Sequence, residues 1–266
     1  MLVGRSDEIL FENTGFSYDG IDSSNFGIYL VNLSTGSRNV PVGVSRSIIE
    51  DKIPTKAEPY FYHLEYEPLR FLVTLVRTAE WTKANRLDIV EWLFQTSYKP
   101  FISDDDEDII YNCIAVDSPQ KILVGNIQRM IELTFQCDAP WAWTDFEEEY
   151  YDLTTNPTST VIEMENLSNI VEWYEPEIEI IKRNGAGTIT LTNAADGNKI
   201  LELEDLLNNE EIYINNRLKQ ISSNEPDRYP LNHFNRNWLR LAKGGNDITV
   251  VGECEINTRM RYPIGI

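Results

Sequence analysis

Apolar and polar residues alternate in short runs along most of the chain, and this period of two is typical of β-strands with one buried face. We expect the runs Tyr60–Tyr66 and Arg70–Arg77 to pair as a hairpin, because only three residues separate them. Near the start, Asp19–Gly20 predicts a tight turn. The other strands expected in the first half are Phe16–Tyr18, a run opening at Phe26–Ile28 with burial on both faces, an extended stretch over 38–45, Ile110–Val116 and Met130–Cys137.

One segment has a helical period instead. Between Thr82 and Thr96 apolar residues recur at spacings of three and four, and the Thr82 hydroxyl can cap the N-terminus of a helix. We expect this helix to pack on the core rather than to bind a ligand. The residues predicted to face the core are Leu87, Val90, Leu93 and Phe94, with Ile89 and Trp92 widening the stripe.

The pattern changes after residue 145. Asp145–Pro157 is acidic, rich in tyrosine and without clear period, so we interpret it as a link between domains. Beyond it, short strands alternate with Asn and Gly turns, which predicts a β-sandwich. The predicted class is mainly β, with an N-terminal β-domain and one helix over 1–145 and a sandwich over 146–266. The strands expected in the sandwich are Ile178–Ile181, Thr188–Thr192, Ile200–Leu203, Ile212–Ile214, Trp238–Leu241, Ile248–Val251 and Arg259–Tyr262.

The formal net charge is −20, and it is unevenly spread. Residues 1–150 hold 12 Lys and Arg against 25 Asp and Glu, a net charge of −13, which leaves −7 for the rest. Such a surface repels nucleic acid. No apolar run approaches the ~20 residues of a membrane span, and the first eight residues do not resemble a secretory signal. We therefore expect assembly in a cytoplasm and no membrane partner.

Residues that could carry chemistry are few. Cys113, Cys137 and Cys254 are far apart in apolar contexts, so we expect buried free thiols rather than a metal site or a disulfide framework. There are only two histidines, and no nucleophile elbow, P-loop or dinucleotide fingerprint. We expect neither an enzyme nor a cofactor. A glycosidase-like pair of carboxylates stays open as a minor alternative, because carboxylates are numerous.

Two polar segments are candidates for interaction. Ile48–Pro59 mixes charges with prolines and is too polar for a core, so it predicts an exposed arm or hairpin. The residues assigned to this arm are Ile48, Ile49, Ile53, Pro54 and Pro59.

The densest run of charge lies between Ser103 and Ile109. A calcium-binding EF-hand loop would need Gly and Glu where Ile109 and Ala115 stand, so we interpret the run as a solvated turn and keep metal binding as the minor alternative. Its acidic residues are Asp104, Asp105, Asp106, Glu107 and Asp108.

The order of several motifs resembles the distal tail protein (Dit) family of siphophages over nearly the whole chain. The first is the aromatic strand, Asp19–Gly20 turn and Ser-Ser-x-Phe-Gly-Ile step ending at Ile28. The helix with Arg86, Ile89, Val90, Trp92 and Leu93 and the acidic turn leading to Tyr111 follow. The most specific marker is Phe135-x-Cys-Asp-Ala-Pro-Trp141, and Leu241–Ile248 completes the pattern.

This resemblance implies a structural virion protein at the tip of a phage tail. It implies a homohexameric ring built by the N-terminal domain, with a galectin-like or carbohydrate-module-like sandwich outside it. The implied partners are the tail tube protein, a tail-tip or fibre protein and a receptor-binding protein, and DNA passes through the ring without specific binding. We expect acidic residues to line part of this channel, with Asp104–Asp108 as candidates by density alone.

One cluster suggests a different function. His233-Phe-Asn235-Arg236 resembles part of the galectin sugar-binding motif, with Trp238 downstream, but Arg236 follows Asn235 directly and the second half of the motif is missing. A turn with a packed Trp238 is the favoured interpretation. A carbohydrate-binding module for attachment to the host surface is the alternative function.

Overall fold

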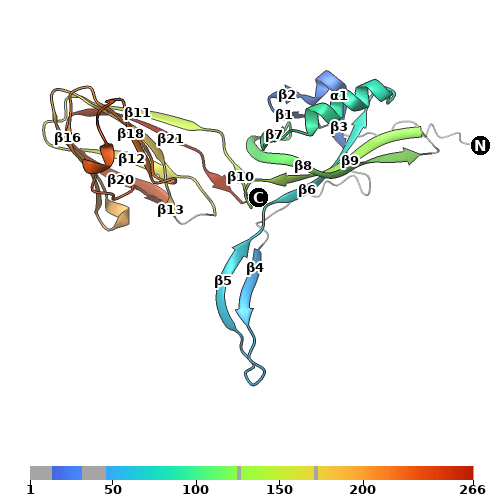
Figure 1. Cartoon of the computed structure of the whole chain (residues 1–266), viewed down its shortest axis with the longest axis horizontal. Helices are drawn as coiled ribbons and strands as arrows, with labels where there is room; N and C mark the ends of the chain where they lie inside the picture. Colours follow the sequence, from blue (N-terminus) through green and yellow to red (C-terminus); the bar gives the residue numbers. More distant parts are fainter. Residues whose placement is uncertain (1–13, 32–45, 125–126, 171–172, 266) are drawn as a thin grey trace, which may run out of the picture. The chain divides into compact units, whose positions relative to one another are not determined.

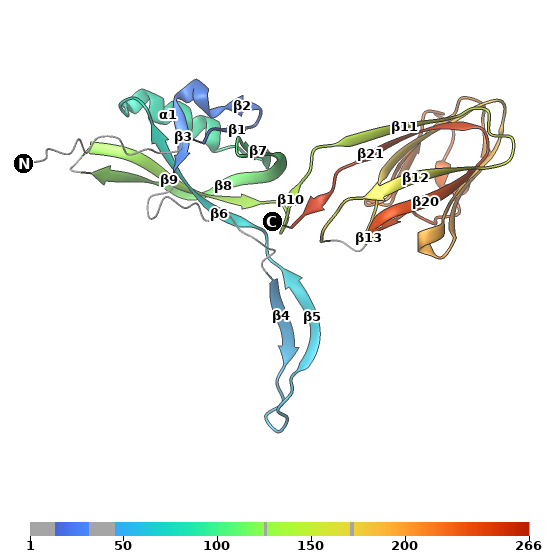
Figure 2. The ribbon, with the colours of Figure 1, turned by 180° about the vertical axis from the view of Figure 1, so that it is seen from behind.

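The computed structural model describes residues 14–31, 46–124, 127–170 and 173–265. The expected stretch over 38–45 lies outside these residues. The chain divides into two compact units: unit 1 comprises Met1–Trp143 with Gly265–Ile266, and unit 2 comprises Thr144–Ile264. Figure 1 shows the elements of both, and Figure 2 shows them from behind.

Unit 1 is built on one antiparallel sheet. Its strands are β1 (Phe16–Tyr18), β2 (Ile21–Asp22), β3 (Ile28–Val31), β6 (Arg70–Arg77), β7 (Lys99–Ser103), β8 (Asp106–Val124), β9 (Ile127–Cys137) and β10 (Ala142–Trp143). The order across the sheet is β2-β1-β7-β8-β9-β6-β3, and β10 pairs with β8. A short 3₁₀ turn, η1 (Ser23–Phe26), connects β2 to β3.

The first turn forms as predicted. Asp19 and Gly20 have φ of 54° and 72°, and Tyr18 pairs with Ile21, so a two-residue loop joins β1 to β2. Glycine and aspartate tolerate this left-handed conformation. The predicted burial of the next strand on both faces is wrong, because only Ile28 and Leu30 of β3 are buried.

An aromatic cluster fills the core of unit 1. The ring of Phe101 packs against Phe16 at 5.1 Å and Phe135 at 5.4 Å, measured between ring centroids. The Tyr18 and Phe71 rings extend the cluster. Aromatic pairs at such distances add stability beyond the area that they bury.

The single helix of the described residues, α1 (Lys83–Leu93), begins at the predicted cap. The Thr82 hydroxyl accepts a hydrogen bond from the Asn85 backbone N–H, and the Asn85 side chain accepts one from Thr82 N. The predicted face is partly wrong, since Leu87 is 59% exposed. The helix is rotated so that Trp92 stacks on Phe26 and donates its indole N–H to Tyr18 O at 2.9 Å. The buried helix residues are Ile89, Trp92 and Leu93.

The predicted pairing of Tyr60–Tyr66 with Arg70–Arg77 is wrong. β5 (Tyr60–Tyr66) pairs with β4 (Arg46–Asp51), whereas β6 pairs with β3 and β9. The reason lies in the three residues between β5 and β6. Leu69 donates its N–H to Ala139 O and accepts from Cys137 N, so the chain continues into the sheet instead of folding back.

Unit 2 is a sandwich of two antiparallel sheets. One contains β11 (Glu147–Leu153), β14 (Glu177–Lys182), β17 (Glu211–Asn215), β18 (Gln220–Ser223) and β21 (Cys254–Met260), in the order β11-β21-β14-β17-β18. The other contains β12 (Thr160–Asn166), β15 (Gly187–Asn193), β16 (Lys199–Leu206) and β20 (Gly244–Val251), in the order β12-β20-β15-β16. Short elements complete it: β13 (Trp173–Tyr174), which pairs with β19 (Leu241–Ala242), and the 3₁₀ turns η2 (Ala194–Asp196) and η3 (Pro230–Asn232). The last short strand, β22 (Pro263–Ile264), belongs to neither sheet of the sandwich.

Alternate residues of these strands fill a shared aliphatic core. Ile178 and Ile180 on β14 and Ile256 on β21 meet Leu191 and Ile248 of the opposite sheet in one buried cluster. This arrangement confirms the predicted mainly β class.

The interpretation of Asp145–Pro157 as a link is wrong, because this segment contains β11. β11 shows no clear alternation because Glu147 and Glu149, which share a face with the buried Leu153, are acidic and exposed. The strand expected over Trp238–Leu241 is irregular up to Leu241. The strand expected over Arg259–Tyr262 is only the end of β21, which stops at Met260.

Candidate functional site

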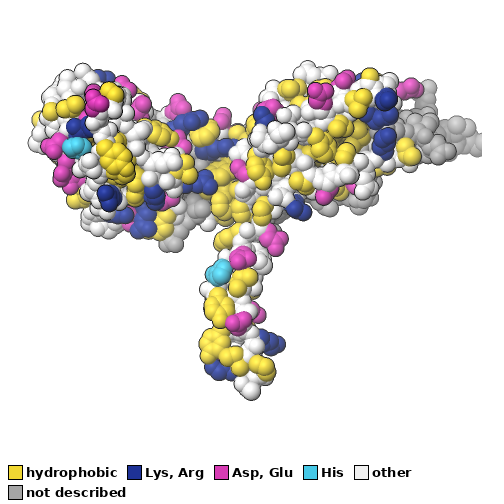
Figure 3. All heavy atoms as spheres, in the orientation of Figure 1, with side chains coloured by type: hydrophobic (Ala, Val, Ile, Leu, Met, Phe, Trp, Pro, Cys, Tyr) yellow, Lys and Arg dark blue, Asp and Glu magenta, His cyan; other side chains and the backbone are white. Residues whose placement is uncertain are grey.

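The β4–β5 hairpin, called the arm below (residues 46–66), exposes apolar side chains. Its two strands pair only with each other among the described residues, and none of their side chains belongs to the buried core of unit 1. Figure 3 shows hydrophobic groups along its length. Phe61 is 61% exposed. The exposed large apolar side chains of the arm are Ile48, Ile53, Tyr60, Phe61, Tyr62 and Tyr66.

The residues assigned to the arm from the sequence all lie on this hairpin. Ile48 and Ile49 are on β4, where they pair with Leu64 and His63 of β5. The connection between the strands carries Ile53, Pro54 and Pro59, and all three are exposed. The sequence pattern did not assign β5 to the arm, because Tyr60–Tyr66 was expected to pair with Arg70–Arg77. Their role in contacts between subunits remains a prediction.

The acidic run forms the turn between β7 and β8. Asp104 and Asp105 occupy the turn itself, while Asp106, Glu107 and Asp108 open β8, and all five are exposed. Asp104 N donates to Gly15 O at 3.1 Å, which fastens the turn to the start of β1. Partial burial and the nearby charges of Asp22, Glu107 and Asp105 raise the pKa of the Asp104 carboxyl. Their place beside a channel remains a prediction.

The galectin-like cluster has structural contacts in unit 2. Asn235 accepts from Glu202 N and donates to Ile200 O, so its amide ties the loop to β16. Arg236 has φ of 63° and turns the chain. Trp238 packs edge-on against Phe234 at 4.8 Å, as the favoured interpretation expected. His233 lies 3.9 Å from Asp205, measured between Nδ1 and Oδ2.

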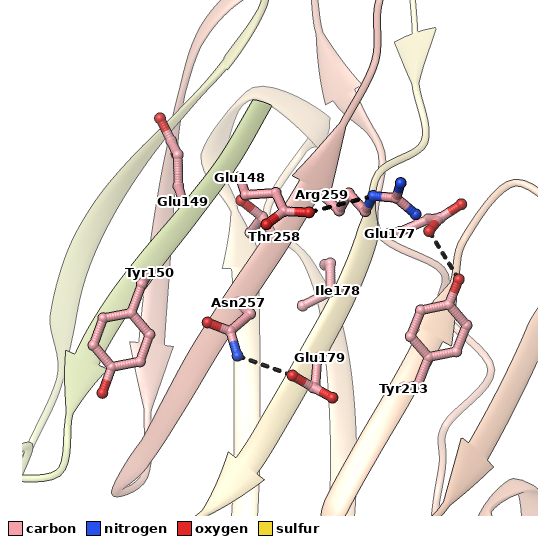
Figure 4. A pocket seen from close by; sticks show the side chains of 10 residues that line it. All are labelled: Glu148, Glu149, Tyr150, Glu177, Ile178, Glu179, Tyr213, Asn257, Thr258 and Arg259. Carbon is pink, nitrogen blue, oxygen red and sulfur yellow. Dashed lines mark hydrogen bonds and ion pairs between the residues drawn. The ribbon is translucent and has the colours of Figure 1, made fainter. Parts of the chain in front are cut away.

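A groove lies on the outer face of the five-stranded sheet (Figure 4). It has a volume of about 520 Å³ and is lined from β11, β21, β14 and β17. One row of side chains crosses these strands in register: Tyr150 is opposite Asn257, Asn257 opposite Glu179, and Glu179 opposite Tyr213. The alternation of strand side chains places this row on one face.

Hydrogen bonds hold the polar groups of this groove. The Asn257 amide donates to Glu179 at 2.9 Å, and the Tyr213 hydroxyl donates to Glu177 at 2.9 Å. Arg259 lies 3.4 Å from Glu148. Burial and the bond to Glu177 raise the pKa of the Tyr213 hydroxyl, so it stays a neutral donor near neutral pH.

The three cysteines are buried and free, as predicted. Cys113 and Cys137 are opposite each other on β8 and β9. Burial raises the pKa of the Cys137 and Cys254 thiols to about 12, and it raises that of Cys113 as well. Because the thiolate is the nucleophile, such thiols are inert at neutral pH.

No group of three or more His, Cys, Asp or Glu side chains among the described residues could hold a metal ion. No helix within the same residues is long and apolar enough to cross a membrane.

Comparison with known families gives a consistent result for both units. A model of the phage tail protein N-terminal domain matches residues 11–139, and a model of the phage tail C-terminal domain matches residues 141–260. The chain belongs to the phage tail protein family. The predicted resemblance is thereby confirmed, and the protein is a structural component of a phage tail.

Relatives of this tail protein span nearly its whole length. It is 23% identical over 251 residues to the SPbeta prophage-derived protein YomH of Bacillus subtilis strain 168, covering 94% of this chain and 98% of YomH. Its fold is similar to that of SPP1 Dit, described as a hub adsorption apparatus in phages that infect Gram-positive hosts. That match has a TM-score of 0.68 at 15% identity and covers 93% of this chain and 98% of SPP1 Dit.

The groove could not be predicted from the sequence. Tyr150 and Tyr213 are 63 positions apart, and Asn257 is farther still, so no local motif joins them. The local pattern that points to this surface is Glu177–Ile180, where glutamate and isoleucine alternate. That pattern identifies an outward face but not its neighbours, which depend on the order of the strands.

Proposed function

We propose that this tail protein is the hub of a phage tail tip and that six copies close into a ring. The domain expected over residues 1–145 builds the ring, and the sandwich expected over 146–266 lies outside it. The observation that carries the proposal is the arm, which exposes six large apolar side chains on a hairpin without a partner sheet among the described residues.

The physics of a two-stranded hairpin supports this role. Such a ribbon is at best marginally stable in water unless a further surface packs against it. Apolar groups gain about 25 cal/mol per Å² when water leaves them. A neighbouring subunit can provide that surface for the arm. A head-to-tail contact of this kind, repeated by rotation, closes into a ring.

The partners proposed for the ring are the tail tube protein on one side and a tail-tip, fibre or receptor-binding protein on the other. The hub would be assembled in the host cytoplasm and remain in the virion. The fold shared with SPP1 Dit supports this placement.

The acidity of the chain fits a channel for DNA. DNA carries one phosphate charge per ~1.7 Å of duplex, so a basic wall would bind it and slow its passage. Only carboxylates within the Debye length of roughly 8 Å of the wall act on DNA. We propose that part of the −13 charge of the first half, with Asp104–Asp108 as candidates, lines the ring. A lumen lined mainly by Lys and Arg would contradict this idea.

The test of the ring compares two sets of exposed aromatic residues. Light scattering of the purified chain is expected to give the mass of six copies of a 30.7 kDa chain, about 184 kDa. Phe61→Ser with Tyr62→Ser should shift the mass toward 30.7 kDa, because the arm loses its apolar contact. The control is Tyr229→Ser, an equally exposed tyrosine of unit 2. A monomeric wild type, or an arm variant that assembles as the control does, would refute the proposal.

A further inference from the structure

We propose that the groove on the five-stranded sheet of unit 2 binds an oligosaccharide that carries amino groups. This site is separate from the ring contacts and from the galectin-like cluster. It would add a ligand-binding activity to a protein whose hub role is structural.

The shape of the site suits an extended ligand. The lining comes from four adjacent strands of one sheet, with a hydrophobic core directly beneath, so the surface is rigid. Ile178 and Thr258 face that core, whereas Tyr150, Asn257, Glu179 and Tyr213 face outward. Concave sites of this size with a few fixed polar groups are typical binding sites for small molecules. Figure 4 shows the row, with Glu149 pointing away from it.

Two tyrosines stand at opposite sides of the groove. Tyr150 on β11 is 58% exposed, and Tyr213 on β17 is 40% exposed. They are three strand spacings apart, roughly 14 Å at about 4.8 Å per spacing. The electron-rich face of an aromatic ring attracts the C–H groups of a sugar ring. Two rings at this separation fit an oligosaccharide better than a single sugar.

The polar groups between the tyrosines are held in place before any ligand arrives. Asn257 fixes Glu179, while Tyr213 and Asn215 fix Glu177 at 2.9 and 3.1 Å. Each carboxylate accepts through several lone pairs, so capacity remains for hydroxyl or amine donors of a ligand. Preorganised acceptors reduce the entropy cost of binding.

The charge of the groove selects among sugars. The groove is lined by one cationic side chain, Arg259, and by the outward-facing carboxylates of Glu148, Glu177 and Glu179. Its outward-facing groups therefore have an excess of negative charge. An acidic polysaccharide would be repelled, whereas protonated amines on a sugar would be attracted. A basic peptide shares the charge but would leave the two aromatic rings without ring-shaped partners.

The galectin-like cluster is a poorer candidate for the same ligand. The Asn235 amide is bound to the backbone of β16, and the Trp238 ring packs against Phe234. The tyrosines and carboxylates of the groove instead face outward across adjacent strands.

The experiment titrates a hexamer of β-1,4-linked glucosamine into the full-length protein by calorimetry. We expect saturable binding that is weaker for the N-acetylated hexamer, which lacks the positive charge. Tyr150→Ala with Tyr213→Ala should weaken binding at least about tenfold, since each stacking contact contributes to affinity. Tyr229→Ala, an exposed tyrosine outside the groove, is the matched control and should bind as the wild type does.

A second variant separates charge from stacking. Glu179→Gln retains an acceptor and the fold but removes one negative charge, so it should reduce the preference for glucosamine over N-acetylglucosamine. The proposal is overturned if the glucosamine hexamer does not bind, or if the double tyrosine variant binds it unchanged. Hexalysine binding that equals glucosamine binding and survives loss of both tyrosines would identify a site for basic peptides instead.

Discussion

The arm and the groove both expose tyrosine side chains, but different structures support them. The arm is a two-stranded ribbon whose large apolar side chains are exposed, as at Ile48 and Phe61. The groove lies on a five-stranded sheet whose inner face is a closed aliphatic core. Exposed aromatic groups on an unsupported ribbon need a protein surface to order them, whereas those on a packed sheet are already positioned for a small ligand.

This difference also appears in the polar contacts. On the arm, Tyr62 donates to Asp51 at 2.8 Å, with both groups exposed. In unit 2, Glu210 is fully buried and accepts from Leu207 N at 2.8 Å and the Ser223 hydroxyl at 2.9 Å. Buried hydrogen bonds hold a surface in one conformation, whereas the exposed hydrogen bonds of the arm contribute little to the free energy of unfolding.

The largest effect is expected at Glu210. Its carboxylate lies 3.0 Å from the Arg228 guanidinium. Glu210→Ala would remove the only carboxylate that this guanidinium contacts among the described residues, although Arg228 would still donate to Glu204 O and Asp205 O. It would also remove the acceptor of Leu207 N and of the Ser223 hydroxyl. We expect a loss of about 3–5 kcal/mol in the free energy of unfolding. Urea denaturation measures it. Glu210→Gln keeps an acceptor and should lose less, and an equal loss in both variants would contradict the account.

The next comparison sets a buried isoleucine against an exposed one. Ile180→Ala on β14 removes a fully buried side chain and should cost about 2–5 kcal/mol. Ile48→Ala on the arm should stay within about 0.5 kcal/mol in the dissociated chain. Urea denaturation of the dissociated chain measures the loss in unfolding free energy for both variants. Equal losses would mean that the arm packs on its own unit.

A smaller effect with a defined pH dependence is expected at Asp196. Arg240 donates to both carboxylate oxygens of Asp196 and lowers the pKa of this group. The ionised form therefore stabilises the fold above the unfolded-state pKa, and this contribution is lost as the pH falls through the folded-state pKa. Asp196→Asn should cost about 0.5–1 kcal/mol near neutral pH.

Thermal unfolding between neutral pH and about pH 3 measures how the stability difference between wild type and Asp196→Asn depends on pH. The gap in Tm between wild type and Asp196→Asn should narrow as the solution becomes more acidic. A gap that stays constant or widens would show that Arg240 does not stabilise the ionised carboxylate.

The smallest effects concern two tyrosine hydroxyls with similar bonds. Tyr213→Phe removes the donor to Glu177 on a supported sheet and should cost up to about 1 kcal/mol. Tyr62→Phe removes the donor to Asp51 on the arm and should leave unfolding unchanged. Denaturation curves of the two variants, recorded in parallel, measure both losses in unfolding free energy. A larger loss for Tyr62→Phe than for Tyr213→Phe would contradict the contrast between the arm and the groove.

Local signals in the sequence predicted the elements whose causes are local. The Thr82 cap, the Asp19–Gly20 turn and several β-strands of the sandwich, such as β14 and β15, depend on neighbouring residues and were found. The rotation of the helix was not found, because it depends on Trp92 stacking with Phe26 from a distant segment.

Pairing between strands depends on contacts between residues far apart in the chain, which local sequence patterns do not show. The short gap between Tyr60–Tyr66 and Arg70–Arg77 predicts a hairpin, yet β5 pairs with β4 because Leu69 is bound to the end of β9. The groove requires the order β11-β21-β14-β17, which joins residues from opposite ends of unit 2. The acidic run Asp104–Asp108 could be assigned to a turn from its own residues. Whether it lines a channel depends on contacts between distant residues, which the sequence does not show.

Electron microscopy of the purified full-length protein tests the central proposal most directly. We expect particles with six-fold symmetry, an open centre, and the arm of each subunit lying on its neighbour. Single copies, or a closed assembly in which residues 46–66 touch no other subunit, would contradict the proposal that the arm builds the hub.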